Sequence, residues 1–240
     1  RYFMSIIFNN IDKMSFDDLG EESEFIPLMT SEDEEALEKE VLPDVLSILP
    51  LTNTVLFPGV VMPINAGSDK SIKLINDANK SNKLIGVIAQ KSPKVENPSI
   101  ENIHGVGTVA KILRVLKMPD GNTTVIIQGK KRFKIKSVVK TDPYIQATID
   151  SVNDKNQKQS NSKFSATIDA IRDIALKIIK ENPNIPSEAS FAIKNIHSSA
   201  FLINFVCSNM NITVKDKQNL LSSVSIEERA LKCLKFLNVE

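Results

Sequence analysis

The sequence is poor in the residue types that most often carry chemistry. Its 240 residues include no Trp, two Tyr, two Cys and two His. Cys207 and Cys233 are widely spaced and lie in helical apolar patterns, so we expect no disulfide framework. With no Trp and two Tyr, the chain has few aromatic rings on which the bases of single-stranded nucleic acid could stack. These absences argue against a disulfide-stapled secreted domain and against a stacking platform for nucleic acid.

Signatures of catalysis and of cofactor binding are also missing. Neither His104 nor His197 has metal-ligand spacing to a cysteine or carboxylate, and neither has a local nucleophile signature, although triad members could still meet in space. The eight glycines form no P-loop. Gly105–Ala110 matches G-x-G-x-x-A, but a polar loop precedes it and a β-rich run follows, whereas the dinucleotide fingerprint needs a strand and then a helix. We expect no catalytic residue, cofactor site or metal site in this chain.

Long apolar runs are absent as well. No window approaches 18 uninterrupted apolar residues, and the first residues lack a basic region that leads into an apolar core. The composition, with 42% hydrophobic and 25% charged residues, is typical of a soluble globular protein. The sequence therefore predicts a cytoplasmic protein with no membrane contact.

Charge is distributed unevenly along the chain. Residues 1–40 hold 12 acidic and 3 basic side chains, a balance of −9, whereas the remaining residues hold 17 acidic and 27 basic ones, a balance of +10. Acidic segments with little apolar surface do not offset the entropy of ordering. We predict a flexible acidic arm over residues 1–43. It could be a solvating tail, or it could dock on the protein's own basic surface.

The most informative stretch runs from Leu49 to Gly67, where prolines interrupt apolar runs. Pro50, Pro58 and Pro63 cannot donate to a β-ladder and belong at strand starts, edges or bulges. Pro58-Gly59 predicts a turn. An apolar surface edged by proline suits the binding of extended polypeptide better than catalysis.

Residues 44–153 are predominantly strand-like. Asp-Gly within residues 119–122, between two β-rich runs, is a strong hairpin signal, and Ser68 or Ser71 can cap a short helix. The expected strands are 45–49, 60–62, 84–89, 109–118, 123–128, 131–139 and 144–152, with a helix over 68–80 and a loop over 91–102. Many short strands with one helix predict a curved antiparallel sheet or a partly open barrel.

Beyond residues 153–163, which are a polar linker or an exposed helix start, the apolar period changes from two to about 3.6 residues. Phe164, Ile168, Ile171, Ala175 and Ile178 form one stripe, which Asn182-Pro183 ends. Later helices are expected after a cap at Ser187, over 200–210, from Thr213 to Leu221, and from a capping box made by Ser225 and Glu228. The fold class is therefore α+β, a β-rich pseudo-barrel followed by an α-helical bundle over residues 154–240.

The basic stretch from Lys130 to Lys136 has two interpretations. On a strand, Arg132, Lys134 and Lys136 share one face, while Phe133 and Ile135 point to the other. The charged face could simply protect an edge strand, or it could make a weak contact with the phosphates of a nucleic acid.

An ordered series of short motifs resembles the amino-terminal substrate-binding domain of the Lon ATP-dependent proteases. The series is Leu49-Pro50-Leu51, Phe57-Pro58-Gly59, Met62-Pro63, Val87–Lys91, Val106–Ala110, Leu116–Gly121 and Gly129–Arg132, followed in the helical half by Asp216-Lys217-Gln218 and Glu227-Glu228-Arg229. The resemblance spans roughly residues 44–238. Two departures are Ser68-Asp69, where many relatives have an Arg–acid pair, and Gln128, where a glutamate is common.

The resemblance implies a hexameric machine whose ATPase and Ser-Lys protease domains follow this region and use ATP and Mg. Neither domain is present here, so we expect a non-catalytic, truncated amino-terminal region that binds misfolded or unfolded polypeptides and selected regulatory proteins. A free-standing adaptor that presents substrates, and a DNA-binding accessory region, are the alternatives.

The expected contact residues are apolar and adaptable or preordered. They are Phe57, Pro58, Val61, Met62, Leu116, Met118 and Pro119. The alternative for the same residues is that most of them fill the core of the domain.

Overall fold

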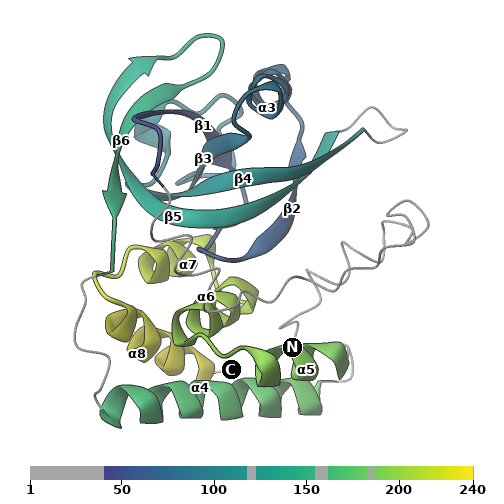
Figure 1. Cartoon of the computed structure of the whole chain (residues 1–240), viewed down its shortest axis with the longest axis vertical. Helices are drawn as coiled ribbons and strands as arrows, with labels where there is room; N and C mark the ends of the chain where they lie inside the picture. Colours follow the sequence, from purple (N-terminus) through teal and green to yellow (C-terminus); the bar gives the residue numbers. More distant parts are fainter. Residues whose placement is uncertain (1–40, 118–122, 155–161, 183–184, 186, 240) are drawn as a thin grey trace. The chain divides into compact units, whose positions relative to one another are not determined.

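The structure is a computed structural model that describes residues 41–117, 123–154, 162–182, 185 and 187–239 (Figure 1). Within them the chain divides into two compact units. The β-rich unit comprises residues 41–153 together with Val214–Ser222, and the helical unit comprises Asp154–Thr213 together with residues 223–239. The predicted α+β class is confirmed.

The β-rich unit is a small barrel with one added strand. Its strands are β1 (Val45–Leu51), β2 (Val61–Ala66), β3 (Leu84–Ala89), β4 (Val106–Lys117), β5 (Thr123–Lys140) and β6 (Gln146–Val152). They are ordered β2-β5-β4-β3-β1-β6, and β5 also pairs with β6. The ring β5-β4-β3-β1-β6 therefore closes on itself, and β2 lies at an edge.

One strand pair departs from the antiparallel sheet that the sequence predicts. β1 and β3 run parallel, because β2 and helix α3 (Asp69–Lys80) form a crossover between them. The cap of α3 is as predicted: the Ser68 hydroxyl accepts a hydrogen bond from the Ser71 N–H at 3.2 Å. The loop over residues 91–102 ends in a single turn of 3-10 helix, Ile100–Asn102.

The prediction of separate strands at 123–128 and 131–139 is wrong, because β5 is continuous over both. Its first half pairs with β2 and its second half with β6, while β4 pairs with both. The pairings of β5 with β4 and with β6 both contain register shifts. Such bulges bend a strand, so that its two halves can pair with different neighbours. The β4–β5 hairpin is confirmed by the pairing of Lys117 with Thr123, although the turn itself lies outside the described residues.

The barrel core is organised around the ring of Phe133, which is 0% exposed. A Cβ on Gly86 would lie 2.9 Å from the Phe133 ring, and one on Gly107 would lie 2.8 Å from it. Glycine at these two positions therefore makes room for the aromatic ring. The predicted Gly105–Ala110 segment is the start of β4, and it has no helix after it. The cluster around the ring comprises Leu46, Ile48, Ile88, Ile103, Val109, Ile145 and Ala147.

Helix α7 (Val214–Leu221) groups with the β-rich unit, although its neighbours in sequence belong to the helical unit. The Gln218 amide Nε2 donates to the Val106 carbonyl at 2.8 Å, and the Arg132 guanidinium donates to the Leu221 carbonyl at 2.7 Å. Arg132 is 2% exposed, so the predicted solvated face of the basic stretch is wrong at this residue. The guanidinium is buried because it binds a carbonyl at the carboxyl end of α7.

The helical unit contains α4 (Ser162–Glu181), α5 (Ser187–Asn195), α6 (Ser199–Asn209) and α8 (Ile226–Leu237). Cys207 and Cys233 are buried, and neither forms a disulfide with a described residue. Arg229 is 0% exposed, and it donates to Asn204 at 2.9 Å and to Asp154 at 3.1 Å. Phe191, on α5, is 62% exposed. Helix α5 begins at Ser187, and the side chain of this predicted cap lies outside the part of the chain that the structure describes.

Candidate functional site

Three strand segments form a ribbon at one side of the barrel: β2, the first half of β5 and the second half of β4 (Figure 1). Residues that pair across neighbouring strands share a face of the sheet. Ile126 of β5 pairs with Pro63 of β2 and with Arg114 of β4. Two residues further along β5, Gln128 pairs with Val61 on one side and with Lys111 on the other.

The two faces of this ribbon differ in burial. One face carries Ile64, Ile112, Val125 and Ile127, all of which are at most 6% exposed, so this face belongs to the core. On the other face no apolar residue of the three strands is fully buried. We call it the ribbon face, and its residues are Val61, Pro63, Asn65, Lys111, Leu113, Arg114, Leu116, Thr124, Ile126 and Gln128.

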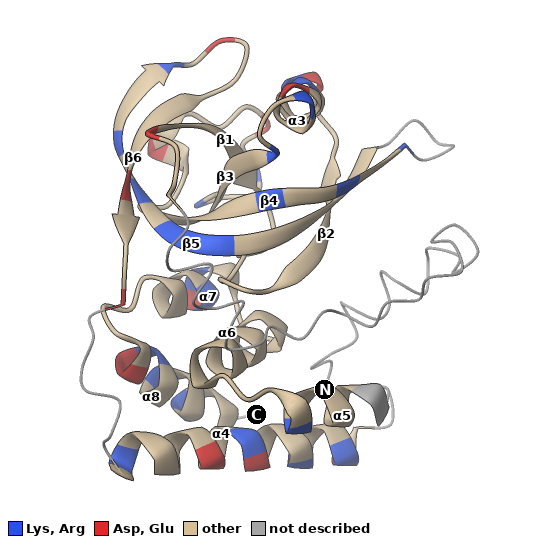
Figure 2. Ribbon diagram, viewed as in Figure 1, with Lys and Arg blue, Asp and Glu red and all other residues tan. Residues whose placement is uncertain are grey.

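The ribbon face combines apolar surface with positive charge. Leu113 is 43% exposed, because a register shift between Ile112 and Arg114 inserts it as an extra residue in β4. Lys111 and Arg114 are exposed on the same strand, and Figure 2 shows the basic segments of β4 and β5. Exposed leucine between cations is suited to a partner that brings both apolar groups and carboxylates.

The free edge of the ribbon is closed to further strand pairing. The Gly129 N–H donates to the Val60 carbonyl at 2.9 Å, so by the alternation of antiparallel bonding Val61, Pro63 and Asn65 direct their backbone groups away from β5. Pro63, at the centre of that edge, has no N–H to offer. The edge is thereby protected against an added strand, so the face and not the edge is the candidate contact surface.

Two of the predicted contact residues lie on the ribbon face. Val61 and Leu116 are half-buried there, on β2 and on β4. Met62 is half-buried on the opposite face, beside Ile127, and its sulfur lies 4.0 Å from the Thr54 hydroxyl. The sequence therefore identified the strands but not which of their residues share a face.

The prediction that Phe57 is a contact residue is wrong. Phe57 is 0% exposed, so its ring fills the core and offers no surface to a partner. The predicted turn at Pro58-Gly59 is confirmed: the Val60 N–H donates to the Phe57 carbonyl at 3.2 Å, and Gly59 has φ 80°. Such a turn takes proline first and glycine at the position of positive φ. Pro58 is half-buried in this turn. Met118 and Pro119 lie outside the described residues.

Sequence reasoning missed Pro63, Leu113 and Ile126. Ile126 could have been found, because counting back from the hairpin pairs Leu116 with Thr124 and so places Ile126 on the same face. Leu113 could not have been found from the sequence, because its exposure depends on a β-bulge that no local pattern indicates.

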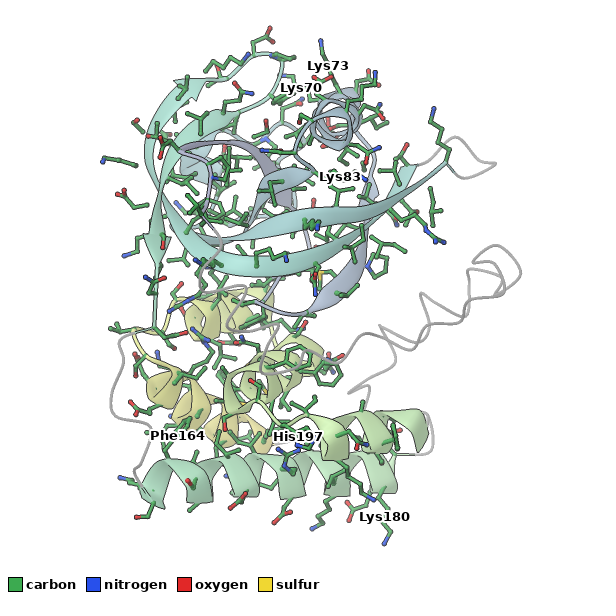
Figure 3. All side chains as sticks on the ribbon, viewed as in Figure 1. Lys70, Lys73, Lys83, Phe164, Lys180 and His197 are labelled. Atoms are coloured by element: carbon green, nitrogen blue, oxygen red, sulfur yellow. The ribbon has the colours of Figure 1, made fainter. Side chains whose placement is uncertain are left out.

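Two titratable groups of the β-rich unit have a pKa displaced from its ordinary value. Burial, and then the charge of Lys91, lowers the pKa of His104, which keeps its imidazole neutral near pH 7. His197 lies on the connection between α5 and α6 (Figure 3). Burial and the hydrogen bond to Asp77, at 3.0 Å, raise the pKa of Tyr144. In the part of the chain that the structure describes, no group of three or more His, Cys, Asp or Glu could hold a metal ion.

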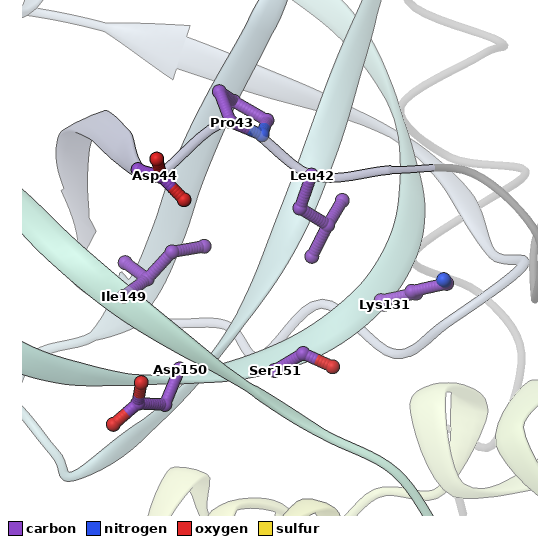
Figure 4. A pocket seen from close by; sticks show the side chains of 7 residues that line it. All are labelled: Leu42, Pro43, Asp44, Lys131, Ile149, Asp150 and Ser151. Carbon is purple, nitrogen blue, oxygen red and sulfur yellow. The ribbon is translucent and has the colours of Figure 1, made fainter.

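Two open hollows in the β-rich unit have volumes of about 250 and 210 Å³. Both are smaller than the ~300–1,000 Å³ that small-molecule sites usually occupy. The first lies between residues 42–44, Lys131 of β5 and residues 149–151 of β6 (Figure 4). Among the described helices, none has the length and apolar character needed to cross a membrane.

Comparison with known proteins identifies the family. Residues 45–239 match the profile of the ATP-dependent protease La (LON) substrate-binding domain. The Lon protease of Flavobacterium johnsoniae is 59% identical over 230 residues, which are 96% of this chain and 28% of that protein. The Lon protease of Cytophaga hutchinsonii is 47% identical over 215 residues, 90% of this chain and 26% of that protein. The chain thus spans about a quarter of the length of these relatives.

Solved structures show the same fold. The N-terminal domain of Lon protease from the Mycobacterium avium complex matches with a TM-score of 0.63 at 20% identity, over 81% of this chain and 98% of that one. A Lon N-terminal domain protein from Xanthomonas campestris matches with a TM-score of 0.57 at 12% identity, over 80% of this chain and 97% of that one. The family profile, the relatives and the fold agree, and this chain belongs to the Lon substrate-binding domain family.

Proposed function

We propose that this chain is the non-catalytic substrate-recognition region of an ATP-dependent serine protease, and that the ribbon face binds extended segments of misfolded or regulatory proteins. The observation that carries the proposal is the exposed apolar strip between cations on an edge ribbon. Membership in the Lon substrate-binding domain family supports it. A free-standing adaptor would use the same face, and no observation favours that alternative.

Contact through the ribbon face is expected to be weak for a single copy. Fully burying an aliphatic side chain stabilises a complex by about 1.5–3 kcal/mol, and the partly buried residues here can contribute only a fraction of that. Association also costs several kcal/mol in lost freedom. In the proposed parent protein, a hexamer that uses ATP and Mg in later domains, six copies acting together would raise the apparent affinity. A cytoplasmic location, which two buried cysteines outside any disulfide suit, belongs to the same proposal.

The substrate class follows from the chemistry of the face. Leu113, Leu116 and Ile126 select apolar side chains, while Lys111 and Arg114 favour nearby carboxylates. A nucleic acid is a poorer match to this unit, because Arg132 on the basic strand is buried and bound to a helix end.

The experiment compares two multiple variants for binding to a reduced, carboxymethylated protein that cannot refold. Leu113→Ser, Leu116→Ser and Ile126→Ser together are expected to weaken binding about tenfold, since each removes partly buried apolar contact worth roughly 0.5 kcal/mol or more. Val138→Ser with Val139→Ser is the matched control, because these residues are 39% and 54% exposed at the other end of β5. Equal affinities for the two variants would reject the ribbon face as the site.

A further inference from the structure

The ribbon face has a complement within the same chain. Residues 21–35 hold the apolar run Phe25-Ile26-Pro27-Leu28-Met29 between two acidic groups, Glu21 to Glu24 and Glu32 to Glu35. Residues 41–153, which include the barrel, hold 15 basic and 8 acidic side chains, a balance of +7. The apolar run of this segment matches the apolar strip of the ribbon face, and its flanking carboxylates match the flanking cations.

The attachment point of this segment lies on the barrel itself. The Ile149 N–H donates to the Asp44 carbonyl at 3.1 Å, and Leu42 packs against the barrel core. Leu42 also lines the hollow beside Lys131 (Figure 4). The acidic segment therefore joins the described chain next to a basic strand that leads to the ribbon face.

The distances along the chain allow an intramolecular contact. The six residues of β5 from Ile126 to Lys131 span ~17 Å. The residues between Met29 and Leu42 can span up to ~40 Å when extended. A tether of this length gives the segment an effective concentration in the millimolar range near the ribbon face, so that even a weak contact keeps the face occupied.

We propose that residues 21–35 bind the ribbon face of their own barrel and compete there with other polypeptides. The inference goes beyond the proposed function, because occupancy by the arm needs no external substrate. The contact is partly ionic, so it weakens as salt screens the charges. It acts as a filter: only segments that bind better than the tethered arm displace it.

The test places a spin label on the full chain at Ser31→Cys, which is selective because both native cysteines are buried. The proposal predicts selective loss of amide signal at Val61, Arg114 and Ile126. Glu32→Gln, Asp33→Asn, Glu34→Gln and Glu35→Gln together restore the signal, as does added salt. Lys111→Gln with Arg114→Gln restores it too, whereas Lys70→Gln with Lys73→Gln, on the exposed side of α3, does not (Figure 3).

Three outcomes would overturn the proposal. The first is a loss of amide signal on α3 or evenly over the whole barrel. The second is a loss that the charge variants leave unchanged. The third is a loss seen only when spin-labelled and isotope-enriched copies are mixed, because it would assign the contact to a second copy of the chain. A separate titration with the carboxymethylated protein distinguishes the two proposals. If it does not displace the arm and binds elsewhere, the proposed function fails while occupancy by the arm stands.

Discussion

At Gly129 a neighbouring backbone leaves no room for a side chain. A Cβ there would lie 2.2 Å from the Phe57 carbonyl oxygen and 3.0 Å from its carbon. Because the turn is held to β5 by hydrogen bonds from Gly59 to Gly129 and from Gly129 to Val60, each 2.9 Å, the backbone cannot easily retreat. Gly129→Ala is expected to lower the free energy of unfolding by about 3 kcal/mol.

Chemical denaturation of the full chain measures this effect. Gly105→Ala is the control, since a Cβ at Gly105 meets nothing within 4 Å, and its effect should stay within about 0.5 kcal/mol. Similar losses for both variants would contradict the close approach at Gly129.

The stabilisation that the Glu228 carboxylate contributes is expected to depend on pH. Its carboxylate accepts from the Val224 N–H at 2.8 Å and pairs with Lys232 at 2.7 Å, while the Ser225 hydroxyl caps the Glu228 N–H at 3.2 Å. The hydrogen bond from Lys232, and then that from Val224, lowers the pKa of Glu228 below its ordinary value of 4.5. The stabilisation is therefore complete above pH 4.5 and is lost as the pH falls through the lower value of the folded protein.

Glu228→Gln is accordingly expected to unfold more easily at pH 7, by about 0.5–1 kcal/mol for a partly exposed cap and ion pair. The difference in free energy of unfolding between the variant and the parent chain should disappear as the pH falls below 4. Denaturation at a series of pH values measures it. A difference that persists at pH 3 would show that the carboxylate charge is not its source.

At the scale of elements, α7 is held to the barrel by polar contacts and not by an apolar stripe alone. Arg132→Met removes the donor to the Leu221 carbonyl and leaves that buried group unpaired, so we expect a loss of about 1.5–3 kcal/mol. Hydrogen exchange should accelerate in α7 before it does in β4. Lys134→Met, at an exposed residue of the same strand, should change neither quantity. Equal effects of the two variants would contradict the anchoring role of Arg132.

The elements also show what a single sequence can predict. Caps and turns are local, so Ser68, Ser225 and Pro58-Gly59 could be identified from residue type and spacing. The parallel β1–β3 pair, the continuity of β5 and the grouping of α7 with the barrel are set by contacts between distant residues. Gly129 resembled a break between two strands, but its role is to admit the Phe57 carbonyl.

At the scale of the whole molecule, the candidate site was predicted in part. Val61 and Leu116, two of the contact residues that the sequence analysis names, lie together on the ribbon face, and their role in binding stays a prediction. Phe57 was assigned to the surface although it is buried, since burial depends on which way a turn faces the barrel. The family could be recognised from the order of its motifs, whereas the candidate face could be defined only from the strand register.

The most direct test is an NMR titration of the 240-residue chain with the carboxymethylated protein, observed at the methyl groups of leucine, isoleucine and valine. The account predicts that Leu113, Leu116 and Ile126 shift first and most, and that Val138 and Val139 at the far end of β5 do not move. Shifts confined to Val138 and Val139, or to the helical unit, would contradict the assignment of polypeptide binding to the ribbon face.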